Sequence, residues 1–232
     1  PFTTIIKVAN TMTARNLVSV VIPTYNRRDL IGETIASVLA QSYEAFELLV
    51  VDDGSTDGTR EYVLDLYGSD SRLRYITQEN AERAVARNRG IRESQGQYIA
   101  FLDSDDLWYP QKLERQLARL SATSELSCCY CLRDVVGETH QDLPDASPQL
   151  EGDIFTPLLS DCFIGSMTPV VPQRCFELVG GFCENRDLLC FEDWEMWTRL
   201  ASQFPWVIQP EILASHRLHA GNTQHAASLE LD

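Results

Sequence analysis

The chain has 232 residues, of which 44% are hydrophobic and 23% charged, and its formal net charge is −15. This composition is typical of a globular domain with a real core, and the acidic balance argues against partners such as nucleic acid or an anionic membrane surface. Seven cysteines, odd in number and mostly in apolar contexts, together with the absence of an 18-residue apolar run or a signal-peptide pattern, predict a cytoplasmic protein with no transmembrane segment, although peripheral membrane association stays open.

The first half of the chain alternates short apolar segments with amphipathic ones. The apolar segments predict strands at residues 17–22, 46–51, 73–77 and 98–102. The amphipathic segments predict helices at 29–40, 56–67, 81–94 and from about residue 110. Four such alternations predict a doubly wound, mostly parallel sheet with helices on both faces.

The strand at 98–102 ends in Asp103-Ser104-Asp105-Asp106, which places three carboxylates within four residues. Uncompensated carboxylates this close raise one another's pKa, so the cluster suggests a counter-charge, most simply a divalent cation. An acidic turn before the next helix is the alternative. The position at a strand end, the usual ligand side of an open α/β sheet, favours a metal and phosphate site.

Four arginines on the helix at 81–94 are conspicuous in an acidic chain. Arg83 and Arg87 are one turn apart and share a face, where they could meet a diphosphate. A solvated helix face is the alternative reading of the same pattern.

After about Ser124 the alternation stops. Short strands are predicted at 126–132, 167–171, 206–208 and 212–217, and the polar segment 137–152 is predicted to be a loop. Glu192 and Asp193 open an amphipathic helix, where a carboxylate could simply complement the helix dipole.

Seven short motifs, in this order and spacing, together resemble the inverting family 2 glycosyltransferases of the GT-A fold. They are Val21-Ile22-Pro23-Thr24-Tyr25-Asn26, Val50-Val51-Asp52-Asp53-Gly54-Ser55, Ala86-Arg87-Asn88-x-Gly90, Asp103-Ser104-Asp105-Asp106, Gly180-Gly181-Phe182, Glu192-Asp193 and His216-Arg217-x-His219. The resemblance implies one domain over residues 1–232 with a Rossmann-like, mostly parallel twisted sheet. Within it, a nucleotide-sugar-binding half (17–124) would be fused to an acceptor-binding half (125–224).

The resemblance also implies an activity and its residues. A sugar would pass from a nucleoside diphosphate, with UDP favoured, to an acceptor hydroxyl with inversion at the anomeric carbon. Asp193 would be the catalytic base, and Asp105 and His219 would hold Mg²⁺ or Mn²⁺. The implied donor-binding residues are Pro23, Tyr25, Asp53, Arg87, Asp103 and Ser104.

The expected partners are a nucleotide-sugar donor and a saccharide or lipid-linked acceptor, as in bacterial-type polysaccharide or glycolipid synthesis. Two alternatives remain: a non-catalytic nucleotide-sugar-binding module of a larger polymerase, and a nucleotidyltransferase. A nucleotidyltransferase would be expected to carry a Gly-rich loop after its first strand, whereas the loop at residues 23–28 contains no glycine.

Overall fold

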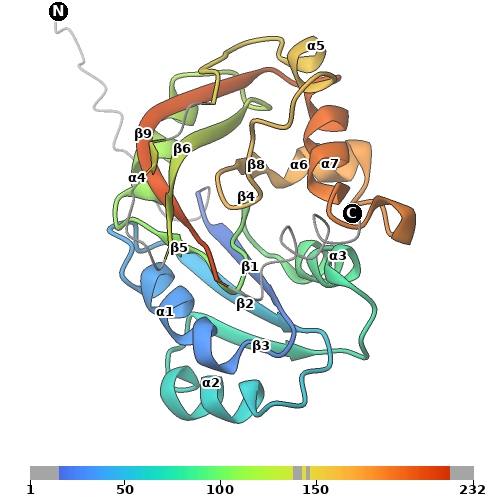
Figure 1. Cartoon of the computed structure of the whole chain (residues 1–232). Helices are drawn as coiled ribbons and strands as arrows, with labels where there is room; N and C mark the ends of the chain where they lie inside the picture. The colour runs from blue at the N-terminus through green and yellow to red at the C-terminus, as the bar shows by residue number, and fades with distance from the viewer. Residues whose placement is uncertain (1–15, 138–142, 145–146, 220–232) are drawn as a thin grey trace, which may run out of the picture.

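Figure 1 shows the protein as a computed structural model, which describes residues 16–137, 143–144 and 147–219. The strands are β1 (Val18–Thr24), β2 (Phe46–Asp52), β3 (Leu73–Thr77), β4 (Tyr98–Phe101), β5 (Leu107–Trp108), β6 (Cys128–Val136), β7 (Leu143–Pro144), β8 (Val170–Pro172) and β9 (Trp206–Arg217). The helices are α1 (Arg28–Leu39), α2 (Thr59–Tyr67), α3 (Arg83–Glu93), α4 (Lys112–Ser121), α5 (Phe155–Leu158), α6 (Gln173–Val179) and α7 (Glu192–Ala201), with a short 3₁₀ helix at Arg186–Leu188.

One mixed sheet runs through the whole described structure, in the order β3-β2-β1-β4-β8-β6-β9-β5, with β7 added on β6. The β1–β2, β2–β3, β1–β4 and β6–β9 pairs are parallel, and the pairs that involve β5, β7 or β8 are antiparallel. The predicted mostly parallel α/β sheet is confirmed, and its four strand-and-helix alternations are the first four strands with α1 to α4.

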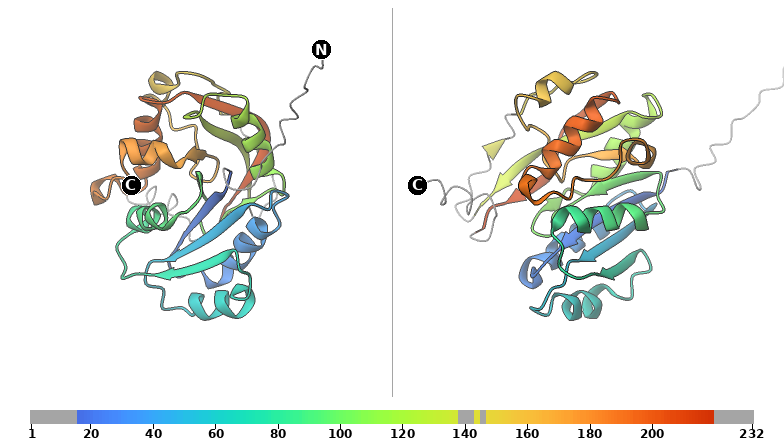
Figure 2. Two further views of the ribbon diagram at one scale, coloured as in Figure 1. Left: turned by 180° about the vertical axis from the view of Figure 1, so that it is seen from behind. Right: turned by 90° about the vertical axis from the view of Figure 1, so that its right-hand side faces the viewer.

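Helices cover both faces of this sheet (Figures 1 and 2). On one face, residues of α1, α2 and α4 belong to the same core cluster as Val20 and Ile22 of β1, whereas on the other face residues of α3, α6 and α7 share a cluster with Val21. Successive residues of a strand point to opposite faces, so a strand covered on both sides is mostly apolar. This requirement explains why β1 and β2 are mostly apolar, with every residue buried. Two of their buried polar residues, Ser19 and Glu47, form a hydrogen bond of 2.6 Å with each other.

Several predicted boundaries were wrong, and local contacts explain two of them. The helix expected at 56–67 begins at Thr59, because the Asp57 carboxylate accepts hydrogen bonds from the Thr59 backbone N–H and hydroxyl and forms a turn before the first helical residue. The two strands expected at 206–208 and 212–217 are a single strand, β9, whose register against β6 shifts near Leu132.

The segment 137–152, expected to be a loop, contributes regular pairing in its described part. Strand β7 pairs with β6, and Gly152 forms an isolated bridge with Trp206. The seven cysteines are free thiols, and cytoplasmic location stays a prediction. Among the described residues, the helices are all too short or too polar to cross a bilayer.

Candidate active site

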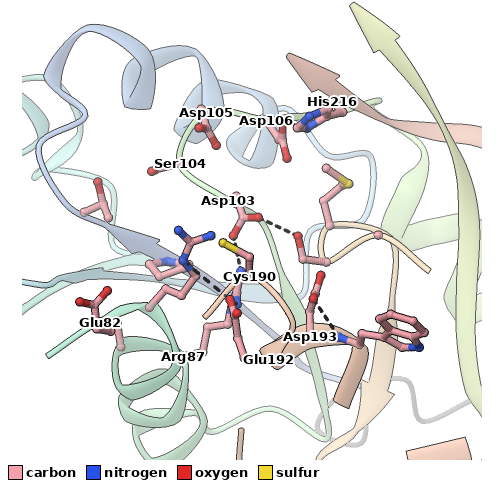
Figure 3. Close-up of a pocket in the computed structure, with 18 of the residues that line it drawn as sticks. Glu82, Arg87, Asp103, Ser104, Asp105, Asp106, Cys190, Glu192, Asp193 and His216 are labelled. Carbon is pink, nitrogen blue, oxygen red and sulfur yellow. Dashed lines mark hydrogen bonds and ion pairs between the residues drawn. The ribbon is translucent and has the colours of Figure 1, made fainter. Parts of the chain in front are cut away.

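A cavity of about 550 Å³ opens where β1, β2 and β4 end, between these strands and the start of α7 (Figure 3). The residues predicted from the sequence that line it are Pro23, Tyr25, Asp53, Arg87, Asp103, Ser104, Asp105 and Asp193. His219 is not among the lining residues, although it contacts Asp105. The fold therefore gathers residues from positions 23 to 193 around one hollow.

Arg87 lies at the centre of this arrangement, with only 2% of its surface exposed. Its guanidinium donates to Asp103 Oδ1 at 2.7 Å and to Glu192 Oε1 at 2.8 Å, and it lies 5.4 Å over the Phe182 ring. Burial alone would lower the pKa of Arg87, but Asp103 and Glu192, with a smaller contribution from Asp193, raise it above its usual value. Arg87 is therefore a permanent buried cation that ties α3 to α7 and to the acidic segment.

Both carboxylate oxygens of Asp103 accept hydrogen bonds within the protein. Oδ1 accepts the bond from Arg87, and Oδ2 accepts a 2.7 Å hydrogen bond from the Ser166 hydroxyl. Burial would raise the pKa of Asp103, but Arg87 and the Ser166 hydrogen bond outweigh it and lower the pKa to about 2. Asp103 is consequently ionised at neutral pH and is held by its neighbours.

Arg83 and Arg87 do share the cavity-facing side of α3, but carboxylates already engage them. Arg83 Nε lies 3.7 Å from Glu192 Oε1, which also receives the bond from Arg87. The expected contact with a diphosphate stays a prediction, and the pairing with Glu192 was missed. A carboxylate next to Asp193 was visible in the sequence, but its burial against α3, 105 residues away, was not.

The side chains of Asp105 and His219 contact each other at the acidic segment 103–106. His219 Nε2 lies 3.0 Å from Asp105 Oδ2, and Arg27 Nε lies 3.7 Å from the same oxygen. Two ligands at right angles around a cation, each about 2.1 Å from it, are about 3.0 Å apart, so this pair fits two positions of a Mg²⁺ or Mn²⁺ shell. Across the described ranges, no cluster of three or more His, Cys, Asp or Glu side chains is positioned to hold a metal.

Asp106 supports the same segment from within the protein. Its Oδ1 lies 3.0 Å from His216 Nδ1 and accepts from the Arg217 backbone N–H at 3.0 Å. Burial raises the pKa of Asp106 to about 6, although the His216 hydrogen bond opposes this shift. The Arg217 guanidinium also donates to the carbonyl of Asp105. Strand β9 thus fixes the backbone that carries the acidic cluster.

Asp193 occupies the first turn of α7 and faces the same cavity as Asp103 and Asp105 (Figure 3). Its Oδ1 accepts from the Trp194 backbone N–H at 2.8 Å, one of the first-turn N–H groups that have no carbonyl partner within the helix. Burial raises the pKa of Asp193 to about 6, while Arg87 acts to lower it. A carboxylate with this pKa can accept a proton near neutral pH and release it again.

Asp53 organises the loop between β3 and α3. Its Oδ1 accepts from Gln78 Nε2 at 2.7 Å and from the Ala81 N–H at 2.9 Å, and its Oδ2 accepts from the Glu82 N–H at 2.9 Å. A carboxylate oxygen can accept two hydrogen bonds, so Oδ2 retains capacity for a donor within the cavity. The predicted bond to a nucleobase stays untested.

The sheet order and the acid-lined cavity define a GT-A glycosyltransferase. A family model described as glycosyl transferase family 2 matches residues 19–168, and the chain belongs to that family. The predicted family and fold are thereby confirmed.

Two bacterial relatives described as glycosyltransferases are similar to the chain over most of its length. The chain is 47% identical over 206 residues to a putative teichuronic acid biosynthesis glycosyltransferase, TuaG, of Bacillus subtilis, covering 87% of this chain and 79% of that protein. It is 39% identical over 158 residues to the Escherichia coli UDP-Glc:alpha-D-GlcNAc-diphosphoundecaprenol beta-1,3-glucosyltransferase WfgD, covering 68% of this chain and 60% of that protein.

Solved structures show the same fold at lower identity. TarS of S. aureus superposes with a TM-score of 0.70 at 20% identity, over 87% of this chain and 36% of that one. The mannosyltransferase PcManGT of Pyrobaculum calidifontis, in complex with GDP-Man and Mn²⁺, superposes with a TM-score of 0.69 at 21% identity, over 95% of this chain and 66% of that one.

Proposed function

We propose that this glycosyltransferase moves a sugar from a UDP-sugar to an acceptor hydroxyl with inversion, using a divalent cation. The observation that carries the proposal is Asp193, a carboxylate with a pKa of about 6 that shares one cavity with the Asp103–Asp106 cluster. A poor nucleophile and a highly charged leaving group require a base and positive charge in the same site.

Asp193 is the base in this proposal. It accepts the proton of the acceptor hydroxyl while the oxygen forms a bond to the anomeric carbon, and the bond from that carbon to the diphosphate breaks. Attack from the side opposite the leaving group inverts the anomeric carbon. The Arg87 cation beside Asp193 stabilises its ionised form, whereas burial opposes that form, and the balance leaves the pKa in the working range of a base.

Asp105 and His219 would hold Mg²⁺ or Mn²⁺, with donor phosphate oxygens filling positions that two side chains leave open. When bound, the cation would neutralise charge on the departing diphosphate. Asp103 supports the segment through its bonds to Arg87 and Ser166, and each of its oxygens can still accept one further contact. TarS has been solved with UDP, and PcManGT with Mn²⁺, which supports both parts of the assignment.

The donor half would be residues 17–124 and the acceptor half 125–224. Pro23, Tyr25 and Ser104 line the cavity near Asp53, the residue that would accept from the uracil N3–H. TarS has also been solved with UDP-GlcNAc, which favours a UDP-sugar here, while PcManGT was solved with GDP-Man. The names of TuaG and WfgD support a role in cell-surface polysaccharide or glycolipid synthesis with a saccharide or lipid-linked acceptor.

The test is turnover of UDP-sugars by the wild type and by Asp193→Asn, with UDP affinity measured on both. Loss of a general base lowers kcat by about 10²- to 10⁴-fold, whereas UDP affinity, which depends on other residues, should be retained. The wild-type kcat/KM should also fall as the pH drops below about 6. UDP binding without turnover in the wild type would indicate a binding module, and near-normal turnover in Asp193→Asn would leave only a structural role for Asp193.

A further inference from the structure

Two aromatic side chains stand beside the proposed base at the edge of the cavity. Phe191 is 53% exposed although it is a large apolar residue, and Trp194 is partly buried. Both line the cavity, and their ring centroids are 6.2 Å apart with ring planes inclined at 45°. Together they form a two-ring surface, which we call the 191/194 platform.

The platform is held in place by the surrounding structure. Trp194 Nε1 donates to the carbonyl of Leu158 in α5 at 2.5 Å, which fixes that ring to a second element. The residue before Phe191 is Cys190, which has φ +73°, a left-handed conformation that a residue with a side chain rarely adopts. Such strain is found mostly at functional sites, and here it sets the chain direction that leads Phe191 to the cavity.

The position of Asp193 decides what must lie on the platform. A base takes a proton only from a hydroxyl within hydrogen-bond reach, about 2.6–3.2 Å. Phe191, Asp193 and Trp194 all line the same cavity, so the group that carries this hydroxyl enters the space that both rings border. Resting on the proposed role of Asp193, we propose that the 191/194 platform is the acceptor subsite and stacks on the face of the acceptor's sugar ring.

The chemistry of the surroundings favours a sugar over an acyl chain. One face of a pyranose presents C–H groups, which suit the negative face of an aromatic ring, and its edges present hydroxyls. The wall of the same cavity carries polar side chains such as Asp161 and Arg133, which suit those hydroxyls. An acyl chain would need a continuous apolar wall that these charged groups interrupt.

The experiment compares Phe191→Ala, Phe191→Leu and Phe191→Tyr. The probes are methyl and octyl glycosides of glucose and of N-acetylglucosamine, with UDP-glucose and UDP-N-acetylglucosamine as donors. Loss of a stacking ring should raise the acceptor KM about tenfold in the alanine and leucine variants, while tyrosine stays near the wild type. UDP affinity should change by less than about twofold, since that ligand contacts other walls. Leu189→Ala is the matched control, because Leu189 is an exposed apolar residue of the same segment that does not line the cavity.

The outcomes distinguish failure of the platform proposal from failure of the proposed function. Unchanged acceptor KM in Phe191→Ala overturns the subsite, and full rescue by leucine with a preference for octyl glycosides means that an acyl chain lies there instead. If the wild type shows no transfer, the proposed function fails. Saturation-transfer NMR from the protein to the methyl glycosides, with UDP present, then measures glycoside binding at the platform without turnover. Loss of that signal in Phe191→Ala supports the subsite, and equal signals in both proteins overturn it.

Discussion

Arg87 connects Asp103 with two carboxylates, those of Glu192 and Asp193, that lie about 90 residues further along the sequence. Asp103 and Glu192 bond to it directly, and Asp193 adds a weaker electrostatic interaction. Because the guanidinium is buried, its removal would leave the buried Glu192 and the partly buried Asp103 without their cation. Arg87 therefore holds the carboxylates of the site in place, apart from any role in binding the donor.

Arg87→Met should lower the free energy of unfolding by about 3–5 kcal/mol, the usual cost of leaving a buried partner unpaired. Denaturant unfolding measures this loss. Adding Glu192→Gln and Asp103→Asn to the same chain should recover part of it, because these changes remove the orphaned charges. Arg89→Ala is the control, since this exposed arginine of the same helix pairs with Glu93 on the surface and should cost less than about 1 kcal/mol. A similar cost for both arginines would contradict the central role of Arg87.

Asp193 should make stability depend on pH in a definite direction. Its pKa is about 6 in the folded protein and near 3.8 in the unfolded chain, so the folded state binds the extra proton between pH 4 and 6. The stability that this proton contributes is complete below pH 4 and is lost as the pH rises through 6. The Asp193→Asn variant has no carboxyl group to ionise at this position and does not lose stability in this way. The Tm of the variant minus the Tm of the wild type should therefore increase from pH 4 to pH 7. A constant Tm difference across that range would mean that Asp193 titrates normally.

At the residue scale, the sequence indicated the main charged residues of the cavity lining and few of the contacts between them. Asp53, Asp103, Asp105 and Asp193 were all predicted to belong to the site, and all line the cavity. The hydrogen bond from Ser166 to Asp103 could not be predicted from the sequence, because a serine in an irregular segment has no periodic pattern that indicates its partner. Contacts across the fold depend on strand order, which spacing along the chain does not encode.

Helix α3 is positioned by its close approach to β1. A Cβ on Gly90 would lie 2.3 Å from Val21 Cγ1, so glycine is required where the helix crosses the strand. Gly90 lies three residues after Arg87, on the same side of the helix. The packing of Gly90 against β1 therefore sets the depth at which the Arg87 guanidinium enters the site.

Gly90→Ala should destabilise the protein by about 1–3 kcal/mol, because the added methyl overpacks the contact with Val21. Val21→Ala alone also destabilises by opening a space, but it makes room for the new methyl. The double variant should therefore be more stable than the sum of the two single effects, and a double-mutant cycle measures the difference. Strict additivity would show that the two side chains do not compete for the same space.

At the element scale, β1 to β4 were predicted within one or two residues because they are short, mostly apolar segments, whereas the two-residue strand β5 was missed. The second half was predicted less well. Strand β6 extends to Val136 rather than to residue 132, and β9 continues through Pro210 with a register shift where a break was expected. Proline and charged residues usually interrupt strands, so a local pattern could not show that pairing with β6 carries β9 through them.

For the whole molecule, ligand binding should appear as added stability. We expect UDP to raise the Tm more than GDP or ADP, because Asp53 would accept from uracil N3–H and purines present different edges. At a concentration of 100 times its Kd, a ligand adds about 2.7 kcal/mol. Thermal unfolding with each nucleotide and Mg²⁺, on the wild type and Asp53→Asn, makes the comparison. A larger shift with GDP that disappears in Asp53→Asn would move the donor class to guanine nucleotides.

The order of strands in the sheet also has a consequence for synthesis on the ribosome. Strand β5, directly after the acidic cluster, pairs with β9, and Asp106 contacts His216, 110 residues later. At about 5–20 residues per second, His216 is made about 5–20 seconds after Asp106. During that interval the nascent chain already has β1 to β4 and their helices, but the acidic segment lacks the strand that fixes it. A chain released before β9 is complete would keep much of its nucleotide half and carry an unfinished site.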